Sequence, residues 1–99
     1  MAPAPMKIRW TRIAADDLKA AYEYIHEQSA VHANKLLNRI LSTIEMLVKH
    51  QFLRRASRIE GTRELAITGT PFVVFYRVRR NQVEILGILH GARKWPDSI

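Results

Sequence analysis

Two apolar runs late in the sequence, at 72–78 and 83–90, are separated by only four residues. Both runs are rich in branched aliphatic and aromatic side chains, which favour a pleated and buried surface. The four residues between them, at 79–82, suffice for a hairpin turn, whereas a parallel connection needs a dozen or more. The sequence therefore predicts an antiparallel hairpin, and its apolar character predicts that both faces are covered.

Three further sequence patterns predict the other strands and the helices of the fold. A β-rich run at 63–68 precedes it, and the alternating KIRW at 7–10 predicts a short first strand. Between them apolar residues recur at intervals of three, four or seven, which predicts one amphipathic helix at 12–28 and a second after Ser29. The predicted class is α+β with the order β-α-α-β-β-β, an antiparallel sheet with a two-helix hairpin packed on one face.

The remaining segments are predicted from local signals. Thr11 is the expected N-cap of the first helix, and Asp16 and Asp17 are expected in its first turn, where the helix dipole favours anions. Residues 49–62 lack a period and are expected to form a loop. Residues 1–6 read as a flexible tail, which leaves 7–99 as a single domain.

Charge and cysteine content restrict the function. The chain of 99 residues has a net charge of +7 and no cysteine, so disulfides and thiolate metal sites are excluded. Residues 51–99 carry nine Lys and Arg against four Asp and Glu, and eight of the nine cations are arginines. Because guanidinium groups suit carboxylates and phosphates alike, an acidic or polyanionic partner is expected.

Several classes of site find no support in the motifs. No run approaches the roughly 20 apolar residues of a membrane span, and no signal peptide is evident, so a cytoplasmic protein without membrane contact is expected. All four glycines are isolated, which argues against nucleotide-binding loops. His26 and His32 have the wrong spacing for a zinc-protease helix. No cofactor and no metal are expected.

The last apolar run leads into four residues that strand packing does not require, namely His90, Arg93, Lys94 and Trp95. An imidazole, two cations and an indole at the rim of a sheet are typical of a contact surface. His90 can equally be a structural histidine at the sheet edge. Arg77 interrupts an apolar strand and needs an anionic partner, either within the chain or on another protein.

The order of elements, with TRELAI at 62–67, FVVFYRV at 72–78 and ILGILHGARKWP at 85–96, closely resembles toxins of the RelE/ParE superfamily of bacterial type II toxin-antitoxin modules. The resemblance spans about residues 7–96. Within that superfamily, RelE-like members cut messenger RNA on the ribosome, whereas ParE-like members poison DNA gyrase. Superfamily membership alone does not choose between these targets.

The residues that match each branch favour ParE. RelE-like toxins place an arginine at the start of the strand that corresponds to 72–78, where this chain has Val73, and a tyrosine or histidine after the arginine that Arg93 matches. Neither Tyr nor His follows Arg93. A ribonuclease would have to use Arg63, Glu64, His90 and Arg93. The R-E-L, F-Y-R-V and L-H-x-x-R signatures are instead typical of ParE-like toxins.

The resemblance therefore implies a toxin of a plasmid-stabilisation type module that inhibits DNA gyrase by binding the gyrase A protein, without chemistry of its own. A cognate ParD-like antitoxin is expected to neutralise it in a hetero-oligomer. The alternative is a RelE-like, ribosome-dependent endoribonuclease that acts on messenger RNA. The residues expected to contact the target are Arg63, Arg77, Arg79, Arg80, His90, Arg93, Lys94 and Trp95.

Overall fold

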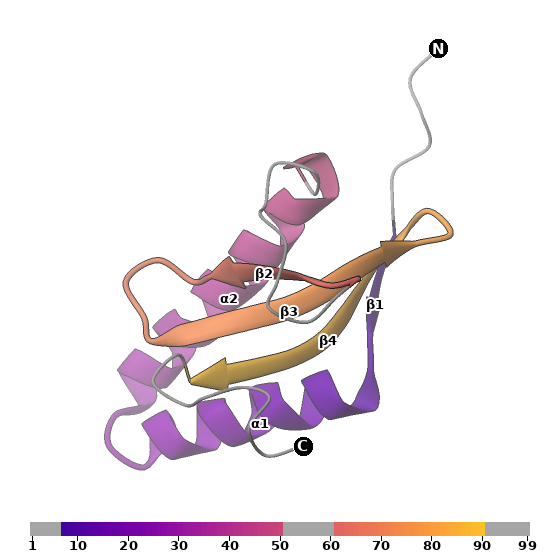
Figure 1. The fold of residues 1–99 in the computed structure, drawn as a ribbon. Coiled ribbons are helices and arrows are strands. Elements are labelled where there is room, and N and C mark those ends of the chain that lie inside the picture. The colour runs from indigo at the N-terminus through magenta and orange to yellow at the C-terminus, as the bar shows by residue number, and fades with distance from the viewer. Residues whose placement is uncertain (1–6, 51–60, 91–99) are drawn as a thin grey trace.

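The computed structural model describes residues 7–50 and 61–90, apart from the side chains of residues 49 and 50 (Figure 1). The elements in chain order are β1 (Lys7–Trp10), α1 (Arg12–His26), α2 (Ala30–His50), β2 (Arg63–Ala66), β3 (Phe72–Arg79) and β4 (Gln82–His90). This order and the α+β class confirm the prediction. Neither helix in the described ranges is long and apolar enough to cross a membrane.

The four strands form one sheet in the order β1-β4-β3-β2. β2 with β3 and β3 with β4 are antiparallel, as the short connections predicted. β1 pairs with β4 in parallel, so the sheet is mixed rather than wholly antiparallel. A parallel neighbour needs a long connection, and here both helices, β2 and β3 separate the two strands. Alternation in KIRW predicts a strand but carries no information about its neighbour.

The junction between β1 and α1 is fixed by Thr11. Its hydroxyl accepts a hydrogen bond from the Ala14 N–H at 3.2 Å, which confirms the predicted N-cap, and donates to the Ile85 carbonyl at 2.7 Å. The same residue therefore starts the helix and anchors it to β4. The prediction that Asp16 and Asp17 occupy the first turn is wrong, because the helix begins at Arg12 and places them one turn further on.

The second helix has a similar start. The Ser29 hydroxyl accepts a hydrogen bond from the His32 N–H at 3.2 Å. α1 ends at His26, two residues before the predicted end, and α2 continues through His50 into the segment that was expected to be loop. The rest of that expected loop, residues 51–60, lies outside the described residues.

Both helices pack on the same side of the sheet, α1 alongside β4 and α2 behind β2 and β3 (Figure 1). The strand residues that face them belong to the core together with one stripe from each helix. Fully buried members of this core are Ala14, Ile40, Leu47, Val74, Tyr76, Val83 and Ile85. The predicted packing of a helical hairpin on one face is confirmed.

The opposite face of the sheet carries the alternate residues of each strand, and we call it the open face. Phe75 and Glu84 on this face are nevertheless buried, in agreement with the prediction that the inner strands are covered on both sides. The turn that joins β3 and β4 consists of Arg80 and Asn81, both with positive φ, at 49° and 60°. Positive φ at both residues is the geometry that suits the twist of a two-residue hairpin.

Candidate functional site

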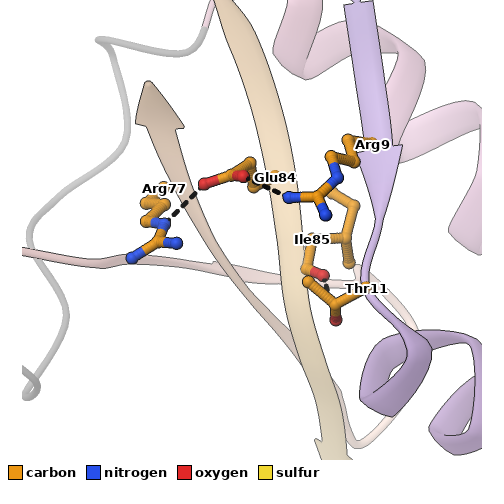
Figure 2. Close-up of polar contacts among 5 residues, drawn as sticks. All are labelled: Arg9, Thr11, Arg77, Glu84 and Ile85. Carbon is orange, nitrogen blue, oxygen red and sulfur yellow. Dashed lines mark hydrogen bonds and ion pairs between the residues drawn. The ribbon is translucent and has the colours of Figure 1, made fainter. Parts of the chain in front are cut away.

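The central polar feature of the open face is an ion-pair cluster on three strands. Glu84 on β4 accepts a hydrogen bond from the Arg77 Nε on β3 at 2.5 Å and from the Arg9 Nη1 on β1 at 2.8 Å (Figure 2). The Glu84 side chain is 8% exposed, whereas those of Arg77 and Arg9 are 38% and 61% exposed. A nearly buried carboxylate thus holds two accessible guanidinium groups.

The electrostatics agree with this geometry. The hydrogen bond from Arg77 lowers the pKa of the Glu84 carboxyl, partial desolvation opposes this effect, and the hydrogen bond from Arg9 adds to it. Glu84 is therefore ionised at neutral pH. The predicted need of Arg77 for an anionic partner is met within the chain.

Two more of the predicted contact residues lie beside this cluster. Arg79 ends β3 and Arg80 begins the following turn, and both are exposed. Arg77, Arg79 and Arg80 thus share one end of the sheet. The structure brings these three predicted residues together.

His90 lies at the far end of β4, eight residues from Gln82 and therefore about 27 Å from that turn. Its ring makes an edge-on contact with Phe72, with centroids 5.7 Å apart. It also lines a cavity of about 530 Å³ between α1 and the ends of β3 and β4, whose wall includes Asp17, Ala21, Tyr24, Phe72 and Ile88. His90 and the three arginines therefore do not form one surface.

Asp17 is the acidic residue among the described residues that line this cavity. β1 pairs with β4 only as far as Ile85, and beyond that point the Asp17 Oδ2 accepts the Ile88 N–H at 3.0 Å. Burial raises the pKa of the Asp17 carboxyl, the bond from Ile88 offsets part of that rise, and neighbouring Asp16 increases it. The carboxylate replaces a strand partner on the edge of β4.

Arg63 and Glu64 begin β2 and are half-buried. Glu64 is paired in register with Phe75 on the open face, whereas His90 is paired with Phe72 on the helix-facing side. Arg63 is opposite Tyr76, four residues along β3 from Phe72, which is a separation of about 13 Å along the sheet. These three residues of the alternative ribonuclease set do not converge. Its fourth residue, Arg93, lies outside the described residues, as do Lys94 and Trp95.

Sequence reasoning missed Lys7, Arg9 and Glu84 on the open face and Asp17 and Tyr24 in the cavity. The signal for the first three was the alternation of charged and apolar residues in KIRW and QVEI, which predicts a polar face on each strand. That the two polar faces adjoin follows only from the parallel pairing. Nothing in the sequence marks Asp17 as the residue that caps β4.

Known proteins share this architecture. A solved structure of the chromosomal ParDE toxin-antitoxin system from P. aeruginosa matches with a TM-score of 0.77 and 32% identity, over 86% of this chain and 95% of that one. The toxin-antitoxin complex RelBE2 of Mycobacterium tuberculosis matches with a TM-score of 0.63 and 22% identity, over 88% and 99% of the two chains. At 22% identity, the similarity to RelBE2 shows only that the fold is shared.

Sequence comparison narrows the class further. The protein Y4kP of Sinorhizobium fredii (strain NBRC 101917 / NGR234) is 33% identical over 93 residues, which cover 94% of this chain and 96% of that protein. Together with the fold, this defines a toxin of the RelE/ParE superfamily. The family described as the ParE toxin of the type II toxin-antitoxin system parDE matches residues 8–95. The chain belongs to this ParE toxin family.

Proposed function

We propose that this toxin inhibits DNA gyrase by binding the gyrase A protein, and that a cognate ParD-like antitoxin neutralises it in a cytoplasmic hetero-oligomer. In this proposal the toxin contributes a surface and performs no bond cleavage. The main support for this proposal is the arrangement of two side chains that could transfer protons, Glu64 and His90, among the described residues.

Scission of RNA by its own 2′-hydroxyl requires a base, an acid and a cation near one phosphate. Glu64 and His90 lie on opposite faces of the sheet, with Phe75 and Phe72 as their respective register partners. No single phosphate can therefore be within hydrogen-bond reach of both. This separation favours binding over catalysis.

The cavity beside α1 also lacks the composition of a ribonuclease site. It brings Asp17, Tyr24 and His90 to one wall, but none of its described lining residues is Lys or Arg. The Asp17 carboxylate is already engaged by a backbone N–H. Val73, where RelE-like toxins carry an arginine, is a half-buried apolar residue of β3. A phosphate in the cavity would meet no lysine or arginine from these residues.

The helical layer has the character expected of an antitoxin contact. Large apolar side chains are exposed on both helices, at Ile13 and Tyr24 of α1 and at Val31 and Met46 of α2. Exposed apolar groups on neighbouring helices favour an amphipathic partner helix. The net charge of +7 favours rapid capture of an acidic one. The ParDE match comes from a toxin-antitoxin system, which supports a partner of this kind.

The test uses two assays in parallel with the purified full-length chain. Gyrase supercoiling and cleavage assays are expected to show loss of supercoiling and accumulation of cut plasmid, and the antitoxin added first should prevent both. In a translation extract, messenger RNA is expected to stay intact. Intact supercoiling together with cleaved message would replace the proposal with the RelE-like endoribonuclease.

A further inference from the structure

The end of the open face nearest the β3–β4 turn carries cations in two rows across three strands. Lys7, Gln82 and Arg79 are register partners in the first row. Arg9, Glu84 and Arg77 are partners in the second. We call these six residues the basic grid. Since side chains alternate along each strand, and Ile8, Val78 and Val83 belong to the helix-facing core, all six project from the open face.

The six grid residues carry a surplus of positive charge. Four cations surround one carboxylate, and Arg80 in the adjoining turn adds a fifth cation at its border. The single carboxylate, Glu84, orients Arg77 through Nε and Arg9 through one terminal nitrogen. Figure 2 shows the terminal nitrogens of Arg77 pointing away from Glu84. A guanidinium has five N–H donors, so each arginine keeps donors for an outside ligand.

The kind of ligand follows from what the grid lacks. The centres of protein–protein interfaces are apolar and depleted of charge, with aromatic anchors, and none of the six grid residues is apolar. Protein–DNA interfaces are polar and strongly positive, and most of their hydrogen bonds go to the sugar-phosphate backbone. Single-stranded nucleic acid is usually held by stacking on aromatic rings, which the six residues do not include. Binding of double-stranded DNA through its backbone does not require aromatic side chains.

We propose that the basic grid binds the phosphodiester backbone of duplex DNA without reading its sequence. Phosphates of the backbone accept hydrogen bonds from the outward donors of Arg9 and Arg77 and neutralise Lys7 and Arg79. The proposal is independent of the enzyme that the toxin inhibits, because the contact involves the toxin and DNA alone. A toxin that inhibits gyrase would thereby contact the DNA on which that enzyme works.

The test measures fluorescence anisotropy of a labelled mixed-sequence duplex titrated with the full-length chain, without gyrase or antitoxin, at several salt concentrations. Four phosphate contacts predict that log K falls with log salt at a slope of about −3.6. The variant Lys7→Gln/Arg79→Gln removes two exposed cations, and its slope is expected to be less negative by about 2. This pair is preferred because replacing Arg9 or Arg77 would deprive the buried Glu84 of a partner.

The matched control is Arg12→Gln/Lys35→Gln, which removes the same charge from exposed positions on α1 and α2. Its slope is expected to stay within about 0.5 of the parent, because neither residue belongs to the grid. Circular dichroism melts of both variants verify that they fold.

Three results would overturn the assignment. The first is an absence of salt-dependent binding by the parent chain at low salt, and the second is an equal loss of slope in the grid and control variants. The third is competition by a polyglutamate peptide or a single-stranded RNA that matches competition by duplex DNA, since that would identify a different partner for the same cations.

Discussion

At the scale of single residues, the carboxylates of Glu84 and Asp17 are held by groups on other secondary-structure elements. Glu84 is held by Arg9 and Arg77, and Asp17 caps the N–H of Ile88. The sequence showed that Arg77 needs an anion, because an apolar strand surrounds it. It did not show which anion, because the contact of Arg77 with Glu84 depends on the register of the β3–β4 hairpin.

The two carboxyls predict opposite effects of acid on stability. The pKa of Glu84 is lowered in the fold, so its contribution is present above the ordinary carboxyl pKa and is lost as pH falls through the folded value. The pKa of Asp17 is raised, so ionisation costs stability as pH rises through its folded value.

Thermal melts of Glu84→Gln and Asp17→Asn between acid and neutral pH measure this difference. At neutral pH we expect Glu84→Gln to melt below the parent and Asp17→Asn to melt at or above it. Both differences should shrink in acid, where the parent carboxyls become protonated. Differences of the same sign at neutral pH would contradict the assigned environments.

A second prediction concerns the turn before β3. Gly69 has a φ of +78°, and a side chain there would displace the Arg39 guanidinium, which donates to the Thr68 carbonyl at 2.8 Å. We expect Gly69→Ala to lower the free energy of unfolding by about 2 kcal/mol, from left-handed strain and the lost hydrogen bond.

The matched control is Gly61→Ala, where φ is +80° but no atom of the described residues beyond its chain neighbours lies within 4 Å of the added carbon. It should cost only the backbone strain, about 1 kcal/mol. Urea unfolding of both variants separates the two effects. An equal loss in both would mean that the contact of Arg39 with Thr68 adds nothing to stability.

At the scale of elements, the sequence predicted those features that depend on interactions between residues close together in the chain. The helix periods, the Thr11 cap and the hairpin at 72–90 follow from spacing within one segment, and the structure has all three. The parallel pairing of β1 with β4 joins residues about 75 positions apart, and no periodicity reports on it. The basic grid depends on that pairing, so Arg77 and Arg79 were predicted as contact residues but Lys7, Arg9 and Glu84 beside them were missed.

The junction of β1 and α1 allows a test of one long-range interaction, the hydrogen bond from the Thr11 hydroxyl to the Ile85 carbonyl. Thr11→Ala removes both the helix cap and the bond to the Ile85 carbonyl, and we expect it to cost about 2 kcal/mol. Ser29→Ala removes only the cap of α2 and should cost about 1 kcal/mol. Denaturant unfolding compares the two. Equal costs would show that the bond to β4 contributes nothing measurable.

At the scale of the whole molecule, the toxin presents three distinct regions. The helices expose apolar side chains, the open face carries the basic grid near the β3–β4 turn, and the far end of β4 holds His90 beside its cavity. The sequence predicted a contact surface at His90, Arg93, Lys94 and Trp95, and it predicted Arg77, Arg79 and Arg80 as further target contacts. In the structure His90 and these three arginines lie at opposite ends of the β3–β4 hairpin, and Arg93, Lys94 and Trp95 lie outside the described residues.

The most direct test of action without chemistry is the amount of gyrase covalently attached to cut plasmid, measured against toxin concentration for the parent and for Glu64→Gln, which removes the candidate base of a ribonuclease and is not among the expected target contacts. We expect attached gyrase to rise with the toxin, and to rise to the same extent in the variant if it folds as the parent does. Absence of attached gyrase, together with transcripts that the parent cuts in a translation extract and the variant leaves intact, would contradict the account.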